Sequence, residues 1–167
     1  MDTPTYNVLF LCTGNSARSI LAEAVLSKLG RGKFKAYSAG SHPRGTVHPL
    51  ALVHIKKLGI PTESYRSKSW EEFSGKGAPE MDFVFTLCDK AGQEACAMVW
   101  AGDPITAHWG IRDPASVEGS DEEKGHAFHI ASLQIQSRIA LFLALPIEAI
   151  DRISLHHRLT EIGQKEG

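Results

Sequence analysis

The feature that most constrains the fold is an eight-residue turn between a buried strand and a helix. The apolar run Val8–Leu11 is long enough for a buried strand, and residues 20–26 have helical composition and spacing. The turn Cys12–Ser19 therefore directs backbone N–H groups and the positive end of a helix dipole into one place. This order predicts an α/β fold with an anion-binding turn at the carboxyl end of the first strand.

The residue types in the turn favour an oxyanion site built around a thiolate. Gly14 and Asn15 tolerate the positive φ values that such a cradle needs. Arg18 offers a planar fork for two oxygens, and Cys12 is expected to be a thiolate in this positive field. The predicted oxyanion-binding residues are Thr13, Gly14, Asn15, Ser16, Ala17, Arg18 and Ser19. The alternative is a small buried cysteine beside an ordinary turn, which the combination of Gly, Asn, Arg and Ser makes the weaker interpretation.

Apolar runs alternate with helical patterns along the rest of the chain, which is typical of βαβ units. Pro49 suits the first position of one helix, and Ser120 with Glu123 forms a capping box that opens another. Right-handed crossovers then predict a four-stranded parallel sheet with helices on both faces, in flavodoxin-like style. We expect strands near 7–11, 34–39, 81–87 and 105–109, and helices over 19–30, 49–59, 70–75, 120–145 and 147–162. A chain of 167 residues fits one domain, 1–167, with residues 146–167 as a C-terminal helical extension.

Composition excludes several classes of partner. A formal net charge of −1 predicts neither a nucleic-acid surface nor a membrane surface, and no apolar run is long enough to span a bilayer. Three cysteines, an odd number, fit a reducing cytoplasm better than a secreted disulfide framework. The histidines are scattered and the cysteines lack zinc-site spacing, so we predict no metal.

The Cys-x5-Arg-Ser loop at the end of the first strand resembles that of the low-molecular-weight tyrosine phosphatase superfamily. This superfamily includes phosphatases and thiol-coupled arsenate reductases. The resemblance runs from about Asn7 to Leu145. Its further landmarks follow in the expected order at 37–40 (Tyr-Ser-Ala-Gly), 86–88 (Thr-Leu-Cys), 108–110 (His-Trp-Gly) and 113–115 (Asp-Pro-Ala).

The other two cysteines separate the two branches of the superfamily. Cys88 and Cys96 stand at the ends of a short segment, as a relay of thiol–disulfide exchanges requires. The phosphatases instead carry a second cysteine at the position of Ala17, and aromatic residues after the Asp-Pro pair, where this chain has Ala115 and Ser116. Both differences favour the reductase branch. The alternative for Cys88 and Cys96 is two small buried residues.

The resemblance implies an arsenate reductase that works without a bound cofactor. Cys12 attacks arsenate held by Arg18 and the loop amides, phosphate or sulfate being mimics, and Asp113 acts as the general acid. Cys88 resolves the adduct as a Cys12–Cys88 disulfide, and Cys96 passes a Cys88–Cys96 disulfide to thioredoxin or glutaredoxin. The alternatives are a phosphatase with a phosphocysteine intermediate and a non-enzymatic oxyanion-binding module.

Two polar residues of the loop have supporting roles in this interpretation. Ser19 is expected to hydrogen-bond the Cys12 sulfur, and Asn15 to order the loop from within. Some related reductases bind potassium through residues matching Asn15, Glu23 and Ser38, plus an acid farther along. Lys68 stands near the place of that acid, and its ammonium group can substitute for the cation.

Overall fold

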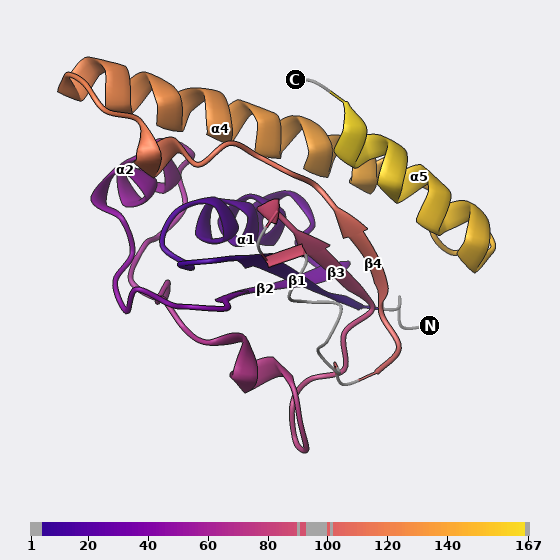
Figure 1. Cartoon of the computed structure of the whole chain (residues 1–167). Coiled ribbons are helices and arrows are strands. Elements are labelled where there is room, and N and C mark those ends of the chain that lie inside the picture. The colour runs from indigo at the N-terminus through magenta and orange to yellow at the C-terminus, as the bar shows by residue number, and fades with distance from the viewer. Residues whose placement is uncertain (1–4, 90, 93–99, 101, 166–167) are drawn as a thin grey trace.

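The computed structural model describes residues 5–89, 91–92, 100 and 102–165, and Cys96 therefore lies outside the described residues. The chain forms a four-stranded sheet in the order β2-β1-β3-β4, with all three strand pairs parallel (Figure 1). The strands are β1 (Tyr6–Cys12), β2 (Phe34–Gly40), β3 (Phe83–Thr86) and β4 (Ile105–His108). The predicted parallel α/β sheet is confirmed, and each predicted strand is present.

The helices lie near the predicted segments, except that the last one starts later and the predicted helix at 70–75 is a shorter 3₁₀ helix. They are α1 (Arg18–Leu29), α2 (Pro49–Lys57), α4 (Asp121–Leu143) and α5 (Arg152–Gln164), with short 3₁₀ helices η1 (Trp70–Phe73) and η2 (Pro114–Ser116). Pro49 is the first residue of α2, and the capping box of Ser120 and Glu123 opens α4. Among the described helices, none combines the length and the apolar character that crossing a membrane requires.

The start of the last helix was predicted wrongly. The sequence pattern predicts a helix from residue 147, directly after Pro146, whereas α5 begins at Arg152. Turn hydrogen bonds from the amides of Ala149 and Ile150 to the Pro146 carbonyl occupy the intervening residues. The Asp151 carboxylate then accepts from the amide of Ser154 at 2.9 Å, which makes Asp151 the N-cap.

The two faces of the sheet are covered differently, by α-helices on one face and by the 3₁₀ helix η1 on the other (Figure 1). On one face, α1 and α4 cover an aromatic cluster in which the rings of Phe85 and Trp109 stack with centroids 3.9 Å apart. Phe142 of α4 meets the Phe85 ring at a centroid distance of 5.3 Å. On the other face, the Tyr37 ring of β2 contacts Phe73 of η1, with centroids 5.4 Å apart. Because both faces are covered, the central strands are apolar without alternation.

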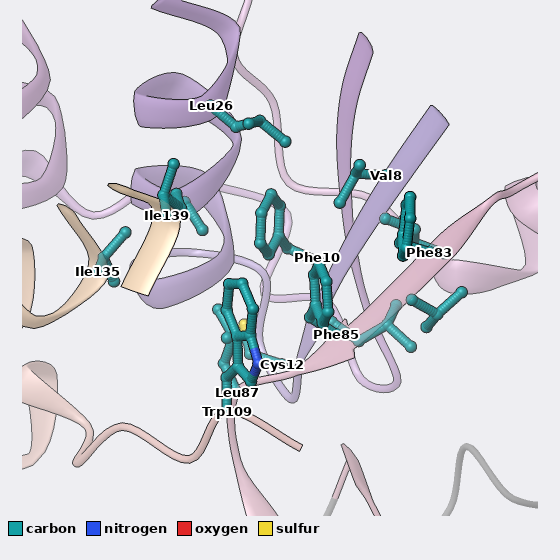
Figure 2. Close-up of a cluster of buried hydrophobic side chains, with 14 of the residues drawn as sticks. Val8, Phe10, Cys12, Leu26, Phe83, Phe85, Leu87, Trp109, Ile135 and Ile139 are labelled. Carbon is teal, nitrogen blue, oxygen red and sulfur yellow. The ribbon is translucent and has the colours of Figure 1, made fainter. Parts of the chain in front are cut away.

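The reactive end of the sheet is where all four strands finish. The strand register pairs Cys12 with Gly40, and Thr86 with both Leu11 and His108, so the carboxyl ends of the four strands meet at one edge. Figure 2 shows Cys12 among the side chains of the buried hydrophobic cluster. Cys12 therefore packs in the hydrophobic core on one side and begins the oxyanion-binding turn on the other.

The helix α5 packs against the edge strand β4 (Figure 1). The indole nitrogen of Trp109 donates to the Leu159 carbonyl at 2.9 Å. The buried Arg138 of α4 donates to the carbonyls of Gly110 at 2.9 Å and Lys165 at 3.1 Å. Gly163 lies so close to β4 that a Cβ atom there would meet the His108 carbonyl oxygen at 2.1 Å.

Candidate oxyanion and thiol site

The loop between β1 and α1 wraps its amides and hydroxyls around the sulfur of Cys12. The amide of Asn15 donates to Cys12 Sγ at 3.2 Å, and Ser19 Oγ lies 2.9 Å from the same sulfur. Asn15 adopts a positive φ of 45°, the left-handed conformation that the sequence predicts for this loop. Gly40 of β2 allows the close approach, because a Cβ there would lie 2.5 Å from the Thr13 carbonyl oxygen.

A pocket of about 90 Å³ opens in front of this sulfur. A cavity that holds one water needs roughly 10–15 Å³, so this pocket has room for the five heavy atoms of a tetrahedral oxyanion. It is lined by Cys12, Thr13, Gly14, Ser16, Ala17, Arg18, His42, Arg44 and Asp113. Of the predicted loop residues, Asn15 and Ser19 do not line this wall. Both are fully buried behind it, where they hold the sulfur and the loop.

The structure brings the predicted arginine and acid together at this pocket. Arg18 donates to the Ile111 carbonyl at 2.9 Å, and its other terminal nitrogen lies 3.7 Å from an oxygen of Asp113. Asp113 is the N-cap of η2 and accepts from the Ala115 amide at 3.0 Å, with Pro114 at the first position of the turn. These contacts hold the carboxyl group of Asp113 beside the guanidinium group of Arg18, although the two residues are 95 positions apart in the sequence.

Two basic residues at the mouth of the pocket were missed from sequence. The amide of His42 donates to the Thr13 carbonyl at 2.9 Å, and the amide of Arg44 donates to the Gly14 carbonyl at 2.9 Å. The Arg44 side chain packs on Gly14, where a Cβ would meet Arg44 Cγ at 3.2 Å. The available signal was their position just after the second strand, at the edge where the Cys12 turn was already expected.

Lys68 holds the loop from behind through a buried polar network. Its amide donates to the Asn15 side-chain oxygen at 2.9 Å, and its ammonium group lies 3.7 Å from Glu23 and 3.3 Å from Ser38 Oγ. The ammonium group also donates to the Arg66 carbonyl at 2.9 Å. Ser38 donates to the Glu23 carboxylate, and the Asn15 amide group donates to Ser38 Oγ at 3.0 Å. The Lys68 ammonium group thus contacts Glu23 and Ser38, two of the residues that the resemblance associates with potassium, and the Lys68 amide contacts the third, Asn15.

Burial dominates the ionisation of this pair. Desolvation raises the pKa of Glu23 above its ordinary value, although Lys68 and the Ser38 hydroxyl pull it down. Desolvation likewise lowers the pKa of Lys68, although Glu23 raises it. For both groups the loss of water therefore outweighs the attraction between them.

A second thiol reaches the loop from β3. Cys88 follows β3 and is buried, and its sulfur lies 3.1 Å from the Thr13 hydroxyl. The amide of Ala91 donates to the same sulfur at 3.4 Å. The structure therefore places Cys88 against the Cys12 loop, whereas the third predicted cysteine, Cys96, falls outside the described residues.

A larger groove of about 530 Å³ begins on the far side of Asp113. It runs between the η2 segment and α4, with the apolar side chains of Pro114, Val117, Ala127 and Ile130 among its lining. Because Asp113 lines both the groove and the small pocket, a group bonded to an oxyanion in the pocket would have apolar surface nearby.

The fold and the loop together define a class of α/β proteins that present a cysteine at the centre of an oxyanion-binding turn. Comparison with known proteins assigns the family. The low molecular weight phosphotyrosine protein phosphatase model matches residues 7–152, and the chain belongs to this family.

Arsenate reductases are among the proteins that this chain resembles in sequence. An arsenate reductase from Halalkalibacterium halodurans is 36% identical over 135 residues, which cover 81% of this chain and 93% of the relative. A solved arsenate reductase in the oxidized state is 27% identical with a TM-score of 0.60, covering 81% of this chain and 98% of that one. The fold is also that of a tyrosine phosphatase from Escherichia coli K30 solved with sulphate, at 24% identity and a TM-score of 0.62, covering 84% of this chain and 99% of that one.

Proposed function

We propose that this protein reduces arsenate to arsenite through a relay of three cysteines. The observation that carries the proposal is the position of the Cys88 sulfur. It lies 3.1 Å from the hydroxyl of Thr13, which belongs to the loop that surrounds Cys12. A phosphatase needs one thiol at this loop, whereas a reductase needs a second thiol within reach of the first. The arsenate reductases among the relatives support the same choice of substrate.

The first step forms a covalent adduct at Cys12. Arsenate lies in the pocket against the loop amides and Arg18, and the Cys12 thiolate attacks arsenic. The sulfur–arsenic bond forms while one arsenic–oxygen bond breaks. Asp113 donates a proton to the departing hydroxyl, which leaves as water.

The second and third steps move two electrons and regenerate Cys12. The Cys88 thiolate attacks the Cys12 sulfur, a disulfide forms, and the electron pair of the sulfur–arsenic bond stays on arsenic. Arsenic passes from As(V) to As(III) and leaves as arsenite. Cys96 then attacks Cys88, which releases the Cys12 thiolate and leaves a Cys88–Cys96 disulfide.

An external dithiol completes the cycle by reducing this disulfide. We propose thioredoxin, with glutaredoxin as the competing reductant, because the relay ends on a dithiol that exchange with another dithiol can restore. A cytoplasmic location, which the odd number of cysteines favours, stays a prediction.

The two relay cysteines give the sharpest test, because their loss should stop the cycle at different points. Cys88→Ser should release no arsenite, since no thiol is left to resolve the adduct. Cys96→Ser should release one arsenite per chain and accumulate a Cys12–Cys88 disulfide, measured by peptide mass spectrometry. Thioredoxin-coupled turnover of arsenate in a variant lacking both Cys88 and Cys96 would refute the relay.

The second candidate is a phosphatase that forms a phosphocysteine at Cys12. The apolar groove beside Asp113 favours it, because this groove can receive the organic group of a phosphoester. Its chemistry needs Cys12, Arg18 and Asp113 and neither of the relay cysteines. Steady hydrolysis of an aryl phosphate without a dithiol, together with no arsenite release when thioredoxin is present, would favour this alternative.

A further inference from the structure

One histidine contacts a residue on each side of Cys88 in the chain. His108 ends β4, and its Nδ1 lies 2.8 Å from the hydroxyl of Thr86 at the end of β3. Its Nε2 lies 3.0 Å from the carboxylate of Asp89. We call these two contacts the His108 bridge. Because a carboxylate only accepts, Nε2 carries a proton, and in the neutral ring Nδ1 accepts from the Thr86 hydroxyl.

The bridge spans the chain on both sides of the sulfur. Thr86 lies two residues before Cys88, and Asp89 directly follows it. The Asp89 side chain is 91% exposed, so its burial does not fix its position, and the contact with His108 anchors it to the sheet. This contact links the residue that follows Cys88 to the end of β4.

Gly92 also lies close to this ring. The amide of Gly92 donates to the Cys88 carbonyl at 3.0 Å, closing a helical turn over the cysteine. A Cβ atom on Gly92 would lie 3.2 Å from Nδ1 of His108 and 3.3 Å from the Thr86 hydroxyl oxygen. Because glycine has no side chain, the turn at position 92 can approach the His108 ring and the Thr86 hydroxyl closely.

The backbone of His108 is itself held from the outside. Gly163 of α5 lies against the His108 carbonyl, close enough that a Cβ there would meet the oxygen at 2.1 Å. The family model matches residues 7–152, so Gly163 and nearly all of α5 lie beyond the matched region. A helix outside the family match thus supports the strand end that carries the ring.

We propose that His108 is a positioning residue for Cys88, holding its sulfur at the Cys12 loop for attack on the arsenic adduct. This inference rests on the relay proposed above. The bridge holds Thr86 and Asp89 on either side of Cys88, and the Cys88 sulfur lies 3.1 Å from the Thr13 hydroxyl. His108 does not line the oxyanion pocket, so the proposed role concerns the resolving step and not arsenate binding.

The test measures the resolving step alone, in a Cys96→Ser background where the Cys12–Cys88 disulfide accumulates. Single-turnover samples are quenched in acid, alkylated and analysed by mass spectrometry. His108→Ala and Asp89→Ala should each slow disulfide formation by about tenfold, since small misplacements of a reacting group cost this much or more. The double variant should be no slower than His108→Ala, because both changes break one contact.

Three controls separate positioning from a general structural effect. Asp103→Ala removes another exposed aspartate, 3.5 Å from Arg152, and should leave the rate unchanged. Iodoacetamide labelling of Cys12 at pH 6 should keep its rate in every variant. His108→Gln, whose amide can still donate to Asp89, should recover part of the lost rate.

The outcomes distinguish this inference from the proposed function. If the Cys96→Ser parent forms the disulfide and the His108 and Asp89 variants match its rate, the positioning role is overturned. If the parent forms none, the relay itself fails, and hydrogen exchange decides the role of the bridge. The amides of Ala91 and Gly92 should then exchange at least tenfold faster in His108→Ala, and unchanged exchange would overturn the bridge.

Discussion

Replacing Lys68 by methionine should destabilise the protein because it leaves a buried carboxylate without its cation. The side chains of Lys68 and Glu23 are 8% and 17% exposed, and their charged atoms lie 3.7 Å apart. Removing one partner of a buried ion pair typically costs about 3–5 kcal/mol. We expect about 3 kcal/mol at pH 8, the lower end of that range, since Ser38 still donates to Glu23.

The size of this loss should depend on pH, with a definite sign. Burial already raises the pKa of Glu23, and the loss of Lys68 raises it further. Above the unfolded-state pKa of about 4.3, the native variant keeps a proton that the unfolded chain has released. The free energy of unfolding therefore falls as pH rises, by up to about 1.4 kcal/mol per pH unit, until the pH passes the raised native pKa. The deficit relative to the parent should be smaller at pH 5 than at pH 8.

Urea unfolding at pH 5, 6.5 and 8, followed by tryptophan fluorescence, measures this deficit. The matched control is the double variant Lys68→Met, Glu23→Gln, which removes both charges and keeps a hydrogen-bonding group for Ser38. It should recover to within about 1 kcal/mol of the parent at pH 8. A deficit that is equal at pH 5 and pH 8, with no recovery in the double variant, would refute a stability cost that arises from an unpaired carboxylate.

Other contacts give three further expectations. Arg18→Lys should lower kcat/KM for arsenate more than tenfold, above about 1.4 kcal/mol, because a lysine cannot replace the planar fork; near-native kinetics would count against the oxyanion role. Cys12 should be alkylated faster than Cys88 at pH 6, and arsenate should protect it, as followed by mass spectrometry of the labelled peptides. Gly163→Ala should lower the free energy of unfolding, measured by urea titration, by about 1–3 kcal/mol, since its Cβ would meet a β4 carbonyl oxygen at 2.1 Å. Gly125→Ala is the control, because a Cβ there would meet no atom within 4 Å apart from its chain neighbours and the nearby backbone of its own helix, and the substitution should be neutral or stabilising.

Much of the fold was predictable because local signals agreed with each other. The buried faces of α4 follow from the spacing of its apolar residues, and its start follows from the capping box at Ser120. The start of α5 was not predictable in the same way. Residues 147–150 are compatible with a helix, yet the turn after Pro146 and the cap at Asp151 delay it. Hydrogen bonds decide between a turn and a helix here, and the spacing of apolar residues carries no information about these hydrogen bonds.

The candidate site shows the same division between local and non-local information. The loop from Cys12 to Arg18 is contiguous, so its composition and its place between a strand and a helix were enough to find it. His42 and Arg44 come from a different crossover, and they line the pocket through backbone contacts with Thr13 and Gly14. The spacing of residues within one segment does not predict which other segment of the chain will lie beside it.

Strand register supplies the missing step. The register pairs Leu11 with Thr86 and Thr86 with His108, which brings the residues that follow β1 and β3 to one edge together with the end of β4. A shift of one residue in either pairing would turn alternate side chains to the opposite face. The Thr86 hydroxyl would then lose its contact with the His108 ring. Of the two His108 contacts on either side of Cys88, only the one with Asp89 would remain. The geometry proposed for the relay therefore depends on the aromatic and aliphatic packing that fixes this register, as well as on the cysteines themselves.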